Sequence, residues 1–207
     1  HGVRDLADGG AWNTIAGQPT DDSELALTLA RTILTQGRYE AAAVFEAFRS
    51  WMISRPFDIG ASTQRSLLGN PDPVSQSNGS LMRASPIGIW AVGDPGRAAS
   101  AAREDSALTH PNPLCLDACA AYAAALAAGI AGASREAMLR AALSHASKTH
   151  AASRARDAIE RGAAGEPPAD FETREGSVLV ALQNAFHQLI RAPSLEAGLI
   201  ATVGAGG

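Results

Sequence analysis

The sequence has few cysteines, no excess of basic residues and no long run of large apolar residues. Its 207 residues include only two cysteines, and 17 Lys and Arg stand against 21 Asp and Glu, for a formal net charge of −4. Nucleic-acid binding depends on Lys and Arg contacts to phosphates, and the arginines here are scattered rather than gathered in a stripe. We therefore expect no nucleic acid among the partners.

The two cysteines are Cys115 and Cys119, four residues apart in a helical pattern. This is not the spacing of a Cys-x-x-Cys metal or redox site, so we expect buried free thiols in a cytoplasmic protein. Both lie in residues 114–133, the stretch that comes closest to a membrane span. It is built mostly from alanine and contains Asp117, so we expect a central core helix and no membrane partner.

Apolar residues recur at intervals of three and four, as in Leu25, Leu29 and Ile33, and this periodicity is typical of amphipathic helices. The sequence has no useful alternating strand pattern and no internal repeat. A chain of this length can bury one core, so we expect a single all-α domain, an orthogonal bundle of short helices. The expected helices cover residues 23–36, 39–54, 62–68, 80–91, 97–108, 114–131, 135–147, 151–163, 177–190 and 194–201.

A hydroxyl and two adjacent carboxylates, Thr20, Asp21 and Asp22, precede the first helix pattern. Oxygen donors of this kind are the ligands that Mg²⁺ and Mn²⁺ prefer. Alternatively, Asp21 and Glu24 form a capping box at the start of the helix. Capping needs only one acid, however, and neighbouring carboxylates repel unless a cation lies between them. Both interpretations stay open from this motif alone.

A polar, glycine-containing turn at residues 75–83 runs into an apolar segment. Backbone amides and serine hydroxyls at such a junction suit a phosphate or pyrophosphate, although an ordinary loop and helix start has the same pattern. Asp58 precedes the expected helix 62–68 and could be a cap or a functional carboxylate. His110 lies in the proline-braced turn Thr109-His110-Pro111-Asn112-Pro113 and could be structural or could contact a ligand.

Taken in this order, Thr-Asp-Asp before a helix, Asp-Ile-Gly, Ser-Asn-Gly-Ser-Leu-Met-Arg and Thr-His-x-Asn-Pro resemble the ADP-ribosylglycohydrolase family. The resemblance covers residues 17–207. It implies an all-helical hydrolase with two divalent cations, Mg²⁺ or Mn²⁺, that removes ADP-ribose from modified protein side chains, arginine rather than serine. The residues it implies are Thr20, Asp21 and Asp22 as metal ligands, Asp58 and Asp22 as catalytic carboxylates, and Ser77, Asn78, Gly79, Ser80, Met82 and His110 as ligand-binding residues.

The chain departs from the family pattern at both ends. A glycine-rich Gly-Asp-Ala-Leu-Gly segment and a loop with a catalytic glutamate would precede residue 1, and a Gly-Gly-Asp-Thr-Asp motif would begin near Gly207. We therefore expect a piece of a longer protein, truncated at both ends. We also expect a monomer. Two other interpretations remain: a catalytically silent ADP-ribose-binding or toxin-neutralising protein, and a purely structural helical domain in which each motif is a cap or turn.

Overall fold

The computed structural model describes residues 5, 7–9, 12–146, 150–171, 173–174 and 176–205. This part of the chain contains ten α-helices and no strand, only two isolated β-bridges, so the predicted all-α bundle is confirmed. The helices are α1 (Asp21–Gln36), α2 (Ala41–Ile53), α3 (Ala61–Leu67), α4 (Ser85–Trp90), α5 (Pro95–Thr109), α6 (Pro113–Ile130), α7 (Arg135–His145), α8 (His150–Ala163), α9 (Val178–Arg191) and α10 (Leu195–Gly204).

Most predicted helix boundaries are close to those observed, but the helix predicted over residues 80–91 begins only at Ser85. Before it the backbone turns, because the amides of Leu81 and Met82 both donate to the carbonyl of Asn78, at 2.8 and 3.0 Å. Pro86 then suits a first helical turn, since it lacks an N–H and its φ is already helical. The predicted end of another helix, at residue 147, lies outside the described residues.

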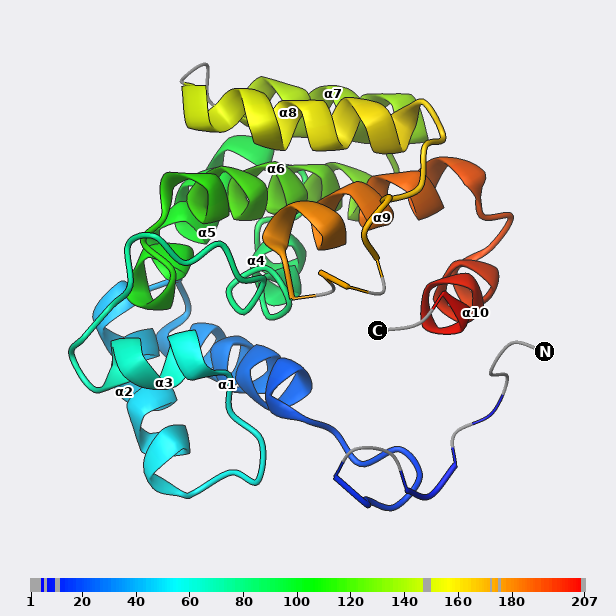
Figure 1. Ribbon diagram of the computed structural model, residues 1–207. Helices are drawn as coiled ribbons and strands as arrows, with labels where there is room; N and C mark the ends of the chain where they lie inside the picture. Colours follow the sequence, from blue (N-terminus) through cyan, green and yellow to red (C-terminus); the bar gives the residue numbers. More distant parts are fainter. Residues whose placement is uncertain are drawn as a thin grey trace.

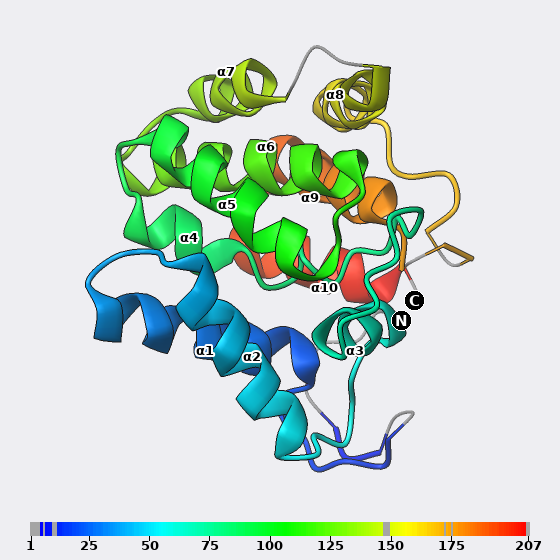
Figure 2. The same cartoon turned by 90° about the vertical axis from the view of Figure 1, so that its left-hand side faces the viewer.

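The helices form three layers with α6 near the centre (Figures 1 and 2). In both views α7 and α8 lie above α6, while α1, α2 and α3 form the opposite layer. By length and composition α6 could cross a membrane, but 61% of its residues are buried inside the protein. Its buried face is largely alanine, which allows α5 and α7 to pack closely against it. The predicted central core helix is confirmed.

The α1 stripe of Leu25, Leu29 and Ile33 is buried against α2 and α4, as the periodicity predicts. Each such leucine contributes roughly 1.5–3 kcal/mol through burial. Cys115 and Cys119 are free and buried. Burial raises the pKa of these thiols to about 12 and about 11, so both stay protonated and act as small apolar side chains.

Candidate functional site

A cavity of about 770 Å³ lies where the start of α1, the segment leading into α3 and the loop at residues 75–83 meet. Its volume is within the range of small-molecule sites. It brings together most of the residues that the sequence singled out: Asp21, Asp22, Asp58, Ser77, Asn78, Gly79, Met82 and His110.

Carboxylates form one wall of this cavity. Asp21, the first residue of α1, is only 7% exposed, and its Oδ2 accepts a hydrogen bond of 3.0 Å from the amide of Gly60. Burial raises the pKa of Asp21, and the nearby negative charges of Asp22 and Asp58 raise it further. Like charges that face one another at a partly buried site favour the binding of a cation.

The helix-capping alternative is wrong for these acids. Thr20 is the N-cap of α1, yet no side chain makes a capping hydrogen bond there, and the Thr20 hydroxyl lies 3.1 Å from Asp22 Oδ2, to which it donates. Glu24 accepts instead from the indole N–H of Trp51 at 2.7 Å. Asp58 caps nothing either, because the N-cap of α3 is Gly60, which has no side chain to make the bond.

Asp21 and Asp22, with the Thr20 hydroxyl bonded to Asp22, suit a hard divalent cation but supply only part of a coordination shell, and Thr20 itself does not line the cavity. Asp21 and Asp22 offer carboxylate oxygens and Thr20 a hydroxyl, the ligand types that Mg²⁺ and Mn²⁺ take. Within the described residues, no group of three or more His, Cys, Asp or Glu is gathered so that it could hold a metal ion. The described residues therefore do not form a complete metal site by themselves.

The polar loop is tied to the segment that leads into α9. The amide of Asn78 donates to the carbonyl of Gly176, and the amide of Val178 donates to the carbonyl of Gln76, both at 2.9 Å. These bonds form the isolated bridge between Ser77 and Ser177. They hold the loop backbone against a part of the chain far away in sequence and help to close the cavity.

A buried arginine supports the same loop from the core side. Arg83 is fully buried; its Nη1 donates to the carbonyl of Gly79 at 3.2 Å and its Nε donates to Asp105 Oδ2 at 3.0 Å. Its guanidinium also lies 4.6 Å from the centre of the Phe48 ring. The loop therefore rests on a rigid charged support rather than on solvent.

Ser80 does not line the cavity, contrary to its predicted role in ligand binding. Its side chain is fully buried, where it accepts hydrogen bonds from the Ser106 hydroxyl at 2.8 Å and the Cys119 thiol at 3.4 Å. The tight turn that starts at Asn78 directs Ser80 toward α5 and α6. Ser80 thus anchors the loop to the core.

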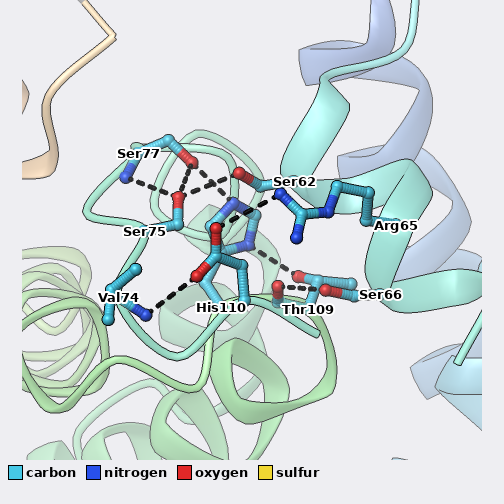
Figure 3. Close-up of polar contacts among 9 residues, drawn as sticks. Ser62, Arg65, Ser66, Val74, Ser75, Ser77, Thr109 and His110 are labelled. Carbon is cyan, nitrogen blue, oxygen red and sulfur yellow. Dashed lines mark hydrogen bonds and ion pairs between the residues drawn. The ribbon is translucent and has the colours of Figure 1, made fainter. Parts of the chain in front are cut away.

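His110 forms the floor beneath the loop (Figure 3). It is 1% exposed, with Thr109 Oγ1 at 2.8 Å from its Nδ1 and Ser77 Oγ at 3.0 Å from its Nε2. Burial, helped by the charge of Arg83, lowers the pKa of His110 to about 3, so the ring is neutral near pH 7. A Cβ on Gly79 would come within 2.8 Å of the His110 ring, so only glycine fits above it.

The opposite wall comes from residues that the sequence motifs did not indicate. Phe171, Gly176, Thr202 and Val203 line it, the last two from α10. The Thr202 hydroxyl accepts from the Asn184 amide at 3.0 Å and donates to the carbonyl of Gly198 at 2.9 Å, which joins α10 to α9. None of these residues has a local pattern that points to a site, because the packing of α10 brings Thr202 and Val203 to the cavity and the segment before α9 brings Phe171 and Gly176.

Comparison with known proteins identifies relatives of this chain. The chain is 30% identical to the ADP-ribosylarginine hydrolase Tri1 of Pseudomonas putida (strain GB-1), over 65% of this chain and 41% of the relative. It is also 30% identical to the ADP-ribosyl-[dinitrogen reductase] glycohydrolase of Rhodospirillum rubrum, over 58% of this chain and 44% of the relative. The chain thus spans about two fifths of the length of these curated relatives.

The fold has a counterpart among solved structures. A protein described as an ADP-ribosylglycohydrolase-related protein complex superimposes with a TM-score of 0.83 and 27% sequence identity, covering all of this chain and 71% of that one. The sequence model of the ADP-ribosylglycohydrolase family matches residues 1–207. The chain therefore belongs to the ADP-ribosylglycohydrolase family.

Proposed function

We propose that this chain forms the substrate-binding part of an enzyme that hydrolyses the glycosidic bond between ADP-ribose and a modified protein side chain, arginine rather than serine. The observation that carries this proposal is the cavity in which three carboxylates face a loop of hydroxyls and backbone amides. The names of two relatives, an ADP-ribosylarginine hydrolase and an ADP-ribosyl-[dinitrogen reductase] glycohydrolase, support the class of bond, and the first of them supports the preference for arginine.

The two ends of the cavity suit the two ends of such a substrate. The diphosphate of ADP-ribose is anionic, so Asp21, Asp22 and Asp58 repel it, whereas hydroxyls and amides near Ser77 and Gly79 can donate hydrogen bonds to it. The carboxylate wall instead suits the anomeric carbon of the ribose, which becomes positively charged as the bond breaks. The substrate is therefore oriented with its scissile bond toward the aspartates.

Thr20, Asp21 and Asp22 would hold Mg²⁺ or Mn²⁺, two ions in the complete site, and such ions orient ribose hydroxyls and make bound water more acidic. Asp22, which is exposed to the cavity, would accept the proton of the attacking water. Asp58 would face the scissile bond, where its negative charge would stabilise an oxocarbenium-like transition state. Its carboxylate oxygens would accept hydrogen bonds from a departing guanidinium.

The test is release of free ADP-ribose from defined substrates by the full-length protein. One peptide carries ADP-ribose on arginine and a matched peptide carries it on serine, each with Mg²⁺, Mn²⁺ or a chelator. We expect release from the arginine peptide that the chelator abolishes. Binding of ADP-ribose without its release would instead identify a catalytically silent binder. If the protein neither binds nor releases ADP-ribose, the proposal is refuted.

A further inference from the structure

Five side chains form a continuous chain of hydrogen bonds beneath and beside the loop (Figure 3). Thr109 Oγ1 and His110 Nδ1 are 2.8 Å apart, and His110 Nε2 and Ser77 Oγ are 3.0 Å apart. From Ser77 the chain continues to Ser75 Oγ at 3.2 Å and on to Ser62 Oγ at 2.9 Å. Thr109 is 1% exposed and does not line the cavity, whereas Ser77 and Ser62 do.

The neutral His110 ring carries one N–H, so one of its nitrogens donates a hydrogen bond and the other accepts one. In the first arrangement the Thr109 hydroxyl donates to Nδ1, and Nε2–H donates to Ser77. In the second arrangement Nδ1–H donates to Thr109, and Ser77 donates its proton to Nε2. The two tautomers give the Ser77 hydroxyl opposite orientations.

The surroundings of Thr109 favour the first arrangement. Among the described residues, His110 Nδ1 is the one hydrogen-bond partner of the Thr109 hydroxyl. If Nδ1–H donated to Thr109, the Thr109 hydroxyl proton would be buried without an acceptor, which is costly. Donation by Thr109 avoids that cost.

We propose that Thr109 is a positioning residue: its hydroxyl fixes the Nε2–H tautomer of His110, which donates to Ser77. The Ser77 proton is then not held by His110 and can turn from Ser75 to an anionic oxygen in the cavity. The anionic oxygen would belong to the diphosphate of ADP-ribose, so this part of the inference depends on the proposed function. With the opposite tautomer, Ser77 would present only lone pairs to that anion and would repel it. Thr109 thus acts on ligand binding without touching the ligand.

The tautomer can be measured directly in the ligand-free full-length protein. Long-range ¹H–¹⁵N spectra distinguish a protonated from an unprotonated ring nitrogen, and the His110 signals are identified by their loss in His110→Gln. We expect Nε2 to be protonated and Nδ1 to be bare near neutral pH. Protonation of Nδ1 in the wild-type protein would overturn the proposal, whether or not ADP-ribose binds.

Variants then separate the hydroxyl of Thr109 from its bulk. Thr109→Val keeps the branched shape and removes the hydroxyl, whereas Thr109→Ser keeps the hydroxyl. By calorimetric titration, we expect Thr109→Val to bind ADP-ribose about tenfold more weakly or worse, and Thr109→Ser to bind like the wild type. Equal affinity of the valine and serine variants would contradict the role of the hydroxyl.

Ser66→Ala is the matched control for loosening of the turn. The Ser66 hydroxyl donates to the carbonyl of Thr109 at 2.6 Å, so its loss weakens the same turn while leaving the Thr109 hydroxyl in place. We expect a lower melting temperature with the wild-type tautomer. A changed tautomer in Ser66→Ala would show that general packing, not the Thr109 hydroxyl, selects the tautomer of His110.

If wild-type protein does not bind ADP-ribose at all, the proposed function fails, but the spectra still decide the tautomer.

Discussion

Arg83 and Asp105 form an ion pair in the core directly beneath the polar loop at residues 75–83, with their side chains 0% and 1% exposed. The arginine joins the loop at Gly79 to α5 at Asp105. Burying two charges is costly, and the bond from Arg83 to Asp105 Oδ2 offsets part of that cost, although Asp105 Oδ1 is buried with no hydrogen-bond partner among the described residues. The loop position is therefore tied to the integrity of the core.

The first prediction concerns this pair. Arg83→Ala leaves the Asp105 carboxylate buried without its partner, so we expect a loss of roughly 3–5 kcal/mol in the free energy of unfolding. Urea denaturation followed by circular dichroism measures it. Arg38→Ala is the control, because Arg38 and Glu40 form an exposed pair that contributes about 0–1 kcal/mol. Similar losses in the two variants would refute the special importance of the buried pair.

The second prediction tests whether the aspartates bind metal. Because Asp21 and Asp22 make no capping bond, Asp→Asn at either position should leave the metal-free melting temperature unchanged or slightly raised. The wild-type protein should be stabilised by Mn²⁺ or Mg²⁺, and each variant should lose most of that stabilisation and of the hydrolase activity. Thermal unfolding with and without the cation measures it. Full activity and an unchanged response to metal in both variants would exclude these residues as ligands.

The third prediction concerns the pH dependence that Asp21 causes. Its pKa is raised in the folded protein above the ordinary value of 3.8, so the folded state holds this proton more tightly than the unfolded state does. The contribution of Asp21 to stability is therefore greatest below pH 3.8 and is lost as the pH rises through the raised pKa. Without metal, Asp21→Asn should gain stability relative to the wild type over that window, measured by urea denaturation at a series of pH values. A constant difference would contradict this prediction.

The fourth prediction concerns Gly79. The family resemblance implies a ligand-binding role for Gly79, and the structure adds a steric one, because the His110 ring lies 2.8 Å from the place that a Cβ would take. Gly79→Ala should therefore destabilise the protein itself, by about 1–3 kcal/mol, before any ligand is added. Gly176→Ala is the control, since a Cβ there meets nothing within 4 Å. An unaltered stability of Gly79→Ala would show that the His110 ring can move aside.

Sequence alone predicted the helical content and most of the residues on one side of the cavity, but not the wall that includes Thr202 or the position of Ser80. Helix formation depends on contacts between residues three and four apart, so the stripe of Leu25, Leu29 and Ile33 can be recognised from the sequence. The order of the four motifs likewise indicated the family, and the family match over residues 1–207 confirmed it. The oxygen donors at Thr20 to Asp22 were visible because they are consecutive.

Only the tertiary structure decided what each of these residues contacts. Asp21 bonds to Gly60 instead of capping α1, and Ser80 faces α5 and α6 instead of the cavity. The wall that includes Thr202 is also absent from any local pattern. These contacts join segments far apart in the chain, and their partners are selected by how the helices pack. A side chain can therefore be recognised as a donor from sequence, whereas its partner follows from the fold.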